Sequence, residues 1–403
     1  MDPRNVPVID AHCHPWDVNE LRSRPASRFL DRLSLTSMLV AAGPGAQEEK
    51  AVERVSRHDP IVSAATRRLA ALFGCDDTRD AVNTARMMAL SAGAAEYTAR
   101  LWADARLFGM LVDDGFPRMK GGFNSFLSSG PGTKVFRVAR ADPAVERLAT
   151  EAETFDALEA RFRDWVRTAC SEEGVVAFKS VIAYRTGLDV ERWDISDARS
   201  SFRDWRAAGF PADHVCAKPV RDTLLASLLS ESRLLGRPVH IHCGGGDPDV
   251  NLRHARPGLL FDLLSRHKDQ AIVLVHAGWP WLEEAAYLAT VFPSVYLEMS
   301  LTTPWSSLAL DQRLELALGM VSYGKLLHGS DEASEPEIIW LAAHVAREAY
   351  SRVLSKAVEH DWLSEREARA ASQRVLWRNC AEVHGLSLGQ FPDEQDGGEE
   401  AEI

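Results

Sequence analysis

Eight short runs rich in Val, Ile, Leu and Phe recur along the chain, and most are followed by a polar residue and then by a stretch with helical periodicity. Most of the runs are apolar throughout, as is typical of parallel strands covered on both faces. Eight such units can close a barrel, so the sequence predicts an α/β fold of the (β/α)8 TIM-barrel type. A doubly wound open sheet is the alternative, although the chain lacks the glycine-rich turn after the first strand that often marks it. The predicted strands are Val6–Asp10, Leu107–Val112, Lys134–Val138, Val175–Val181, Pro238–Ile241, Ala271–Val275, Val295–Met299 and Lys325–Leu327.

The spacing of these runs is uneven, because the first ends near Asp10 and the second begins only near Leu107. Residues 27–106 between them contain Ala- and Leu-rich stretches at helical periodicity, which predicts a helical insertion lying over one mouth of the barrel. We therefore expect one barrel domain over residues 1–388. Residues 389–403 are rich in Gly and acidic residues and are expected to form a disordered tail.

Composition excludes several classes of protein. Among 403 residues, 46 Lys and Arg stand against 58 Asp and Glu, and no basic run appears, which argues against a nucleic-acid partner. The six cysteines are scattered without a C-x-x-C pair and indicate reduced thiols. Neither a signal peptide nor an apolar segment of about 18 residues is present, so we expect a cytoplasmic protein without a membrane span.

The first strand runs into the pattern His12-Cys13-His14. Residues i and i+2 of a strand point to the same face, so the two histidines can converge on one metal ion while Cys13 turns away. Alone the pattern is weak, because among 13 histidines in a chain of this length an H-x-H pair arises by chance about four times in ten. Its place at the C-terminal end of an N-terminal strand makes it a candidate metal site.

Four more ligand-type residues stand at or just past the ends of later strands, namely Lys179, His242, His276 and Asp331. Active sites of barrel enzymes are built at this end of the strands. His240 shares a face with His242, so either histidine could be the ligand, and we prefer His242 because it is nearer the strand end. The pattern predicts one polar cluster at the C-terminal mouth of the barrel.

The order H-x-H, Lys, His, His, Asp across successive strand ends resembles the amidohydrolase superfamily, whose distorted barrel holds one or two divalent metals. The segments His240–Asp249 and Leu327–Glu335 are similar to its amidohydrolase-2 branch, in particular to the barrel that precedes a glutamine-synthetase-like domain in some proteins. The resemblance implies that His12, His14 and Asp331 are metal ligands. It assigns His242 and His276 to a second metal or to the substrate carbonyl.

Lys179 matches the strand-four lysine that two-metal members of this superfamily carry as a carbamate. A carbamate would bridge two ions about 3.5–4 Å apart. The alternative is an unmodified lysine that hydrogen-bonds at the mouth or orients a substrate carboxylate. We expect one or two divalent ions with zinc as the metal, and manganese or iron as the alternatives.

Residues just beyond the strand ends are candidates for substrate binding. The guanidinium groups of Arg185 and Arg253 are suited to a substrate carboxylate, although a structural ion pair is the competing interpretation. Trp16 and Trp279 could wall an apolar pocket, or they could be packing anchors. Further candidates near strand ends are Arg140, Trp305, Asp113 and Glu298.

The resemblance implies hydrolysis of an amide or other C–N bond of a small, carboxylate-bearing molecule by metal-bound hydroxide, with Asp331 moving the proton and His276 polarising the carbonyl. The association of relatives with glutamine synthetase suggests a γ-glutamyl amide. The alternative is a metal-dependent, non-oxidative decarboxylase of a small carboxylic acid, for which one metal suffices. A scaffold with a vestigial site is less favoured, because all six ligand-type positions are intact. The expected partner is a small molecule, and the insertion is compatible with a homodimer.

Overall fold

The computed structural model describes residues 5–23, 29–40, 46–117, 119–172, 174–212, 215–332 and 334–387. In this part of the chain, eight parallel strands form one sheet in the order β1 to β8, each paired with the next in sequence. Every strand overlaps the apolar run predicted for it. The strands are β1 (Val8–Cys13), β2 (Leu107–Asp113), β3 (Lys134–Arg140), β4 (Val175–Ser180), β5 (Val239–His242), β6 (Ile272–Val275), β7 (Val295–Glu298) and β8 (Leu326–Leu327).

Backbone hydrogen bonds join the first strand to the residues at and beyond the last one. The amide of Ala11 donates to the carbonyl of His328 at 2.8 Å, and the amide of Asp331 donates to the carbonyl of His12 at 2.8 Å. The strands therefore curve into a barrel, and the predicted (β/α)8 architecture is confirmed.

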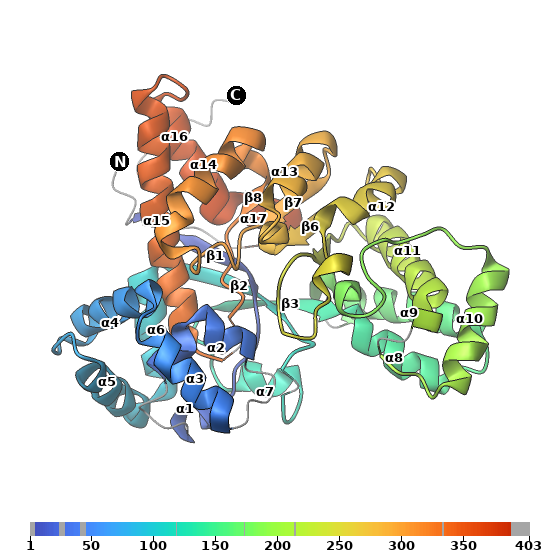
Figure 1. Cartoon of the computed structure of the whole chain (residues 1–403), viewed down its shortest axis with the longest axis horizontal. Helices are drawn as coiled ribbons and strands as arrows, with labels where there is room; N and C mark the ends of the chain where they lie inside the picture. The colour runs from blue at the N-terminus through green and yellow to red at the C-terminus, as the bar shows by residue number, and fades with distance from the viewer. Residues whose placement is uncertain are drawn as a thin grey trace.

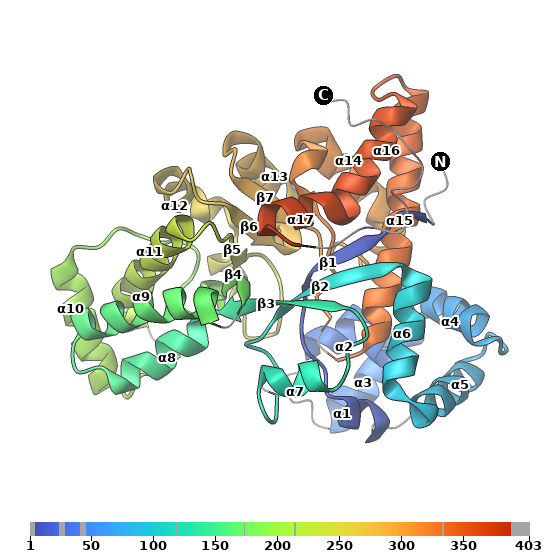
Figure 2. The ribbon, with the colours of Figure 1, turned by 180° about the vertical axis from the view of Figure 1, so that it is seen from behind.

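Helices surround this barrel in Figures 1 and 2. They follow the strands as in repeated β-then-α units, which is the arrangement that covers both faces of a parallel sheet. The helices are α1 (Val18–Ser23), α2 (Leu35–Val40), α3 (Ala46–Ser56), α4 (Pro60–Phe73), α5 (Arg79–Ala92), α6 (Ala94–Ala105), α7 (Phe123–Ser128), α8 (Ala141–Glu151), α9 (Phe155–Glu172), α10 (Ile195–Ala207), α11 (Lys218–Leu234), α12 (Phe261–Arg266), α13 (Leu282–Val291), α14 (Leu310–Met320), α15 (Pro336–Glu359), α16 (Glu365–Gln373) and α17 (Asn379–His384).

The connection between β1 and β2 contains helices α1 to α6. Helix α4 begins at Pro60, where the side chain of Asp59 accepts a hydrogen bond from the amide of Ile61, and it ends at Gly74 in the left-handed conformation. Helices α4 and α6 lie beside α15 in Figure 1, and α6 packs on α15 and on β2. That residues 27–106 as a whole cover the mouth stays a prediction, and the tail predicted at 389–403 lies outside the described residues.

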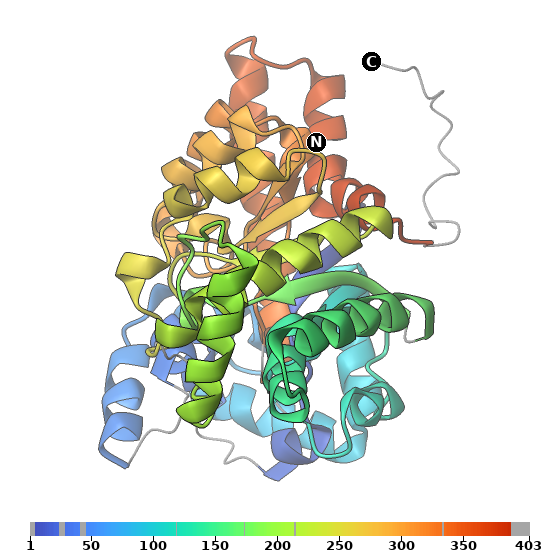
Figure 3. The ribbon, with the colours of Figure 1, turned by 90° about the vertical axis from the view of Figure 1, so that its right-hand side faces the viewer.

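Amphipathic helices supply the outer layer of the core. In α9 the residues Phe155, Leu158, Phe162, Val166 and Ala169 follow helical spacing along one face, and each is at most 1% exposed. Burying a side chain such as Phe162 contributes about 1.5–3 kcal/mol. Helix α9 packs against α8 and α11, and Figure 3 shows the group α8 to α11 on one flank of the barrel.

The inside of the barrel is filled by a smaller apolar cluster. Ile9, Leu111, Val138, Val273 and Leu327 are all fully buried and contact one another there. The interior is therefore a packed core, and chemistry is confined to the mouth at the strand ends. Within the described residues, no helix combines the length and the apolar character needed to cross a membrane.

Candidate metal centre and its pocket

A cavity of about 400 Å³ opens at the C-terminal ends of the strands. Ionisable side chains dominate its wall, and residues at or just past the ends of β1, β3, β4, β5, β6 and β8 contribute to it. The segment between β1 and β2 also takes part, through Glu20 of α1 and Arg32 of the short helical turn Leu30–Leu33. The lining residues used below are His12, His14, Arg140, Lys179, Tyr184, Arg185, His242, Asp247, Asp249, His276 and Asp331.

A register shift in β1 brings both histidines of the H-x-H pattern into the mouth. Ile9 and Ala11 belong to the inner cluster, so simple alternation would turn His12 outward. The pairing of β1 with β2 shifts register between Asp10 and Cys13, and an irregularity of this kind re-aims a side chain. His12 and His14 consequently both line the cavity, while the thiol of Cys13 points at the backbone carbonyl of Leu111, 3.6 Å away.

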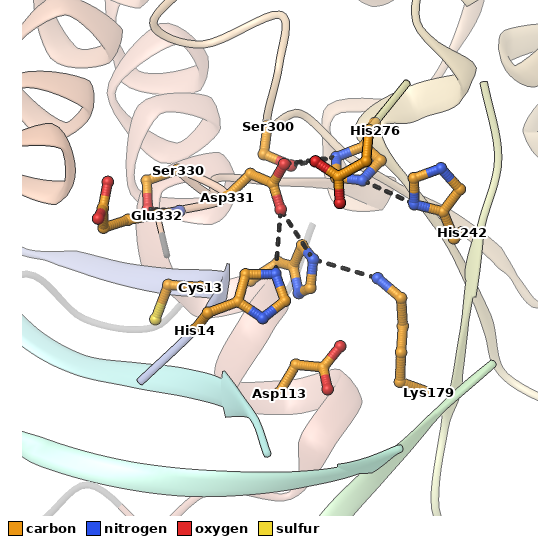
Figure 4. A network of polar contacts seen from close by, with 12 residues as sticks. Cys13, His14, Asp113, Lys179, His242, His276, Ser300, Ser330, Asp331 and Glu332 are labelled. Atoms are coloured by element: carbon orange, nitrogen blue, oxygen red, sulfur yellow. Dashed lines mark hydrogen bonds and ion pairs between the residues drawn. The ribbon is translucent and has the colours of Figure 1, made fainter. Parts of the chain in front are cut away.

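Asp331 faces both of these histidines (Figure 4). Its Oδ1 lies 3.2 Å from His12 Nε2 and 3.3 Å from His14 Nε2. The backbone of Asp331 is left-handed, with φ of 56°, and this strained conformation aims the carboxylate into the mouth. Although burial alone raises the pKa of Asp331, the opposing influence of His276, His14 and Lys179 is larger and holds it below its usual range.

The distances from Asp331 Oδ1 to each of the two histidines are compatible with ligands of a divalent metal ion. Bonds of about 2.0–2.2 Å to nitrogen and oxygen place neighbouring ligand atoms of a four- to six-coordinate ion about 2.8–3.6 Å apart. The separations of 3.2 and 3.3 Å from Asp331 Oδ1 to the two histidine Nε2 atoms lie within that range. His12 also groups with His276 and Asp331, and with His14 and Asp113, so ligand-type atoms surround it on several sides.

Lys179 extends from β4 to the same cluster. Its Nζ lies 3.1 Å from His12 Nε2, and the side chain is 1% exposed. Burial lowers the pKa of Lys179 to about 8, because a charged ammonium loses its hydration there. Carbamate formation needs a neutral amine, so this lowered pKa is compatible with the modification, which stays a prediction.

Arg140 and Asp113 form an ion pair beneath the cavity. The Nε and Nη2 of Arg140 donate hydrogen bonds of 2.6–3.1 Å to the carboxylate of Asp113. Burial raises the pKa of Asp113, but Arg140, His14 and Lys179 lower it further and keep this carboxylate ionised. Arg140, considered from the sequence as a substrate contact, therefore has a protein partner already.

A second pair of histidines stands beside the first cluster. His276 Nε2 lies 3.0 Å from His242 Nδ1, and His276 Nδ1 lies 2.8 Å from the hydroxyl of Ser300, as Figure 4 shows. Burial lowers the pKa of His242 to about 3 and that of His276 well below its usual value, so both rings are neutral. Glu298, which the sequence left without a role, accepts a hydrogen bond from Ser300 Oγ at 2.7 Å, and burial raises its pKa to about 8.

The residues predicted to bind substrate divide into two groups. Arg185 lines the cavity, with its Nε bound to Glu146 at 3.1 Å. Trp16 is 2% exposed and packs instead against Trp102 and Phe126, with ring centroids 6.0 and 4.8 Å away. Their predicted roles remain predictions, and of these two residues the structure places only the arginine in the cavity lining.

Two other predicted contacts lie apart from the cavity lining. Arg253 is exposed in the short helical turn Leu252–His254, and Trp279 is partly buried against Gly245, where a Cβ would come within 2.9 Å of the indole. Trp305, a further candidate, donates from its indole nitrogen to the carbonyl of Leu33 at 3.1 Å. These side chains follow strand ends in the sequence but do not point into the cavity.

The structure also separates the two histidines of β5. His240 Nε2 lies 2.8 Å from Nε2 of His384 in α17, whereas His242 lines the cavity. Cys243 donates from its thiol to the carbonyl of Val275, and burial raises its pKa to about 12, so it is not a thiolate.

Tyr184, Asp247 and Asp249 line the cavity but were not singled out from the sequence. The hydroxyl of Tyr184 accepts a hydrogen bond from the amide of Asp247 at 3.0 Å. Burial, followed by the charges of Asp331 and Asp249, raises the pKa of Asp247 to about 6. The only available signal was position, because these residues occupy the loops that follow β4 and β5.

Comparisons with known proteins agree with this geometry. A family model described as Amidohydrolase matches residues 198–379, a segment that contains His242, His276 and Asp331. Protein fluG of Emericella nidulans is 33% identical over 236 residues, which are 56% of this chain and 27% of fluG, so the chain spans about a quarter of that relative.

Solved structures share the whole barrel. A proposed metal-dependent hydrolase from Lactobacillus casei ATCC 334 aligns with a TM-score of 0.80 at 22% identity, over 95% of this chain and 96% of that one. A glucuronate isomerase from Caulobacter crescentus aligns with a TM-score of 0.65 at 16% identity, over 97% and 93%. At these identities the likeness shows the fold alone. The chain is therefore similar to the amidohydrolase family over residues 198–379, and the solved structures share its barrel fold.

Proposed function

We propose that the protein is a metal-dependent hydrolase that cleaves an amide or other C–N bond of a small, carboxylate-bearing molecule. The observation that carries the proposal is the grouping of ligand atoms from His12, His276 and Asp331 in the mouth of the barrel, with His14 Nε2 3.3 Å from Asp331 Oδ1. Zinc is the proposed metal, because imidazole and carboxylate ligands suit it. A bound divalent ion would lower the pKa of water and polarise a carbonyl group.

The side chains around the cluster can manage the proton that such a hydrolysis transfers. Oδ1 of Asp331 faces the two histidines of β1, while Oδ2 lies 3.9 Å from His276 Nδ1 and can hold a proton. Because its pKa lies below the usual range, Asp331 is ionised and can accept a proton from water and return it to the leaving nitrogen. His242 and His276, on the same wall, are placed to orient the carbonyl.

The cavity wall presents both signs of charge to a substrate. Arg185 uses Nε and Nη1 for protein contacts, and no described residue accepts a hydrogen bond from its Nη2. The side chains of Asp247 and Asp249 form no ion pair with the described residues, although both line the cavity. A substrate with a carboxylate and an ammonium could place the carboxylate near Arg185 and the ammonium near Asp247 and Asp249. An α-amino acid head group carries both charges, which supports a γ-glutamyl amide as the substrate.

A substrate panel tests this function. Purified protein loaded with zinc is assayed for ammonia or amine release from γ-glutamyl amides, from the matching amides without the α-amino group, and from amides without a carboxylate. We expect turnover to decrease in that order and to disappear in Asp331→Asn. Release of carbon dioxide from small carboxylic acids, with no amine release from any amide, would replace the hydrolase proposal by the decarboxylase.

A further inference from the structure

The side chain of Tyr184 belongs to the cavity wall, and the proposed reaction gives it no role. It ends the short helical turn Ile182–Tyr184, which comes just after β4, and its ring packs on that of His242 with centroids 4.6 Å apart. Among the described residues, no hydrogen bond or ring contact joins the Tyr184 side chain to His12 or Asp331. The tyrosine therefore lines a part of the cavity outside the group of ligand atoms around Asp331.

The hydroxyl of Tyr184 has one hydrogen bond within the described residues, and chemistry fixes its direction. The backbone amide of Asp247 lies 3.0 Å from the Tyr184 oxygen, and an N–H can only donate, so the oxygen is the acceptor. A phenol keeps its own proton at neutral pH, because its pKa is about 10. No described residue accepts that proton. The Tyr184 O–H is therefore a donor available to a bound molecule, and the bond that it accepts from Asp247 polarises it.

Gly246 allows the hydroxyl to occupy this position. A Cβ on Gly246 would overlap the Tyr184 oxygen and would come within 2.9 Å of His242 Cε1, so only a glycine permits this close approach. The loop of the glycine is held in turn by its backbone, since the amide of Gly245 donates to the carbonyl of Trp279 at 2.6 Å. The donor is thus fixed before a ligand arrives, which lowers the entropic cost of binding.

We propose that Tyr184 is a specificity-determining residue, whose hydroxyl donates a hydrogen bond to a substrate carboxylate away from the bond that is cleaved. Arg185, the next residue, lines the same cavity, and no described residue accepts a hydrogen bond from its Nη2. Asp247, whose amide binds the hydroxyl, lines it as well. A neutral donor with one cationic and one acidic neighbour suits the head group of an α-amino acid, where carboxylate and ammonium share one carbon. The inference rests on the proposed function, because it names the group of the γ-glutamyl amide that Tyr184 binds.

Such a contact strengthens substrate binding without accelerating the chemical step, because the head-group carboxylate is unchanged during hydrolysis. Tyr184→Phe removes the O–H and keeps the ring that packs on His242. We expect KM for γ-glutamyl amides to rise about 10–100-fold, the usual effect of losing a hydrogen bond to a charged group, with kcat unchanged. A fall in kcat at unchanged KM would place the hydroxyl at the reacting atoms and overturn the inference.

Tyr350→Phe is the matched control, since it removes a buried tyrosine hydroxyl that has no partner among the described residues and lies outside the described cavity lining. It should leave KM and kcat at their wild-type values. Gly246→Ala keeps the Tyr184 hydroxyl but displaces it, so KM should rise again. In the Tyr184→Phe background the same substitution should have a smaller effect, because the overlapping oxygen is gone. Equal effects of Gly246→Ala in both backgrounds would overturn the role of the hydroxyl.

Ligand binding without turnover separates this inference from the proposed function. In zinc-loaded protein labelled with 13C at tyrosine Cζ, the Tyr184 signal is identified by its loss in Tyr184→Phe. L-Glutamate, which has the head-group carboxylate, should shift this signal, whereas 4-aminobutyrate, which lacks only that carboxylate, should leave it unchanged. No shift with L-glutamate, or equal shifts with both compounds, would overturn the inference. A shift with L-glutamate in a protein that hydrolyses no amide would contradict the proposed function alone.

Discussion

Two buried pairs of histidines have different surroundings although their members His240 and His242 stand two residues apart on β5. His242 and His276 are hydrogen-bonded at 3.0 Å and line the cavity. His240 and His384 are hydrogen-bonded at 2.8 Å and are absent from the described lining of that cavity. Both pairs are buried, so burial alone does not distinguish a reactive histidine from a structural one.

The two pairs differ in the group that is hydrogen-bonded to Nδ1 of one histidine. His384 Nδ1 donates to the backbone carbonyl of Cys380 at 2.8 Å, which leaves Nε2 to accept from His240. A carbonyl cannot exchange a proton, so that pair has one stable arrangement. His276 is held instead by a hydroxyl and a carboxylate, which can both exchange protons. The mouth pair is therefore the one that can respond to a ligand.

The largest expected difference between the pairs is in catalysis. Asp331 lies 3.9 Å from His276, and Asp331→Asn should lower kcat/KM about 10²–10⁴-fold, because it removes the proton acceptor and a charged ligand. Asparagine tolerates the left-handed backbone at this position, so circular dichroism should be unchanged. His384→Gln is the control and should retain activity. A fully active Asp331→Asn would remove Asp331 from the mechanism.

Matched substitutions on β5 compare the pairs directly. His242→Gln should lower activity or zinc affinity about 10–100-fold with little change in stability. His240→Gln should instead lower the free energy of unfolding by about 1–3 kcal/mol, because it leaves buried partners unsatisfied, and should keep its activity per folded molecule. Denaturant titration and steady-state kinetics on both variants check this, and exchanged phenotypes would break the comparison.

Stabilisation of the folded protein by zinc should depend on the histidines at the mouth and not on the His240–His384 pair. At zinc concentrations about 100 times the dissociation constant, binding raises the stability of the folded state by about 2.7 kcal/mol. Thermal unfolding with and without a chelator should show this difference in wild type and in His384→Gln but not in His12→Ala. An equal zinc effect in His12→Ala would exclude the H-x-H pattern as the site.

The last expected difference concerns the stability of the fold in acid. Burial lowers the pKa of His384 to about 4 from its usual 6.5, so in this interval the unfolded chain binds a proton that the folded protein does not. Its contribution to stability is complete above pH 6.5 and is lost as the pH falls toward 4. His384→Gln should therefore make the slope of unfolding free energy against pH shallower by about 1.4 kcal/mol per unit, and an unchanged slope would contradict the assignment.

Most of the barrel could be predicted because most of its strands are largely apolar runs. Helices such as α9 could be predicted from the helical spacing of their apolar residues. The sequence could not show that a register shift between Asp10 and Cys13 turns His12 into the mouth. Strict alternation from Ile9 and Ala11 gives the opposite result, so the H-x-H prediction reached the right geometry without its physical cause.

Side-chain direction beyond the strand ends was the least predictable property. Trp16 and Arg185 both follow strands closely, yet one packs between helices and the other lines the cavity. Their directions depend on local backbone conformation, as the left-handed φ of His276 and Asp331 illustrates. Such conformations are imposed by tertiary hydrogen bonds, including that from Asp331 to His12, which no local pattern encodes.

The contacts between the first strand and the residues after the last one can form only when synthesis of the chain is nearly finished. The amide of Ser330 donates to Asp10, a contact that spans 320 residues of sequence. At synthesis rates of about 5–20 residues per second, His12 leaves the ribosome's catalytic centre roughly 15–60 s before Asp331 is added. Until then the nascent chain carries His12 and His14 of the proposed metal site without Asp331.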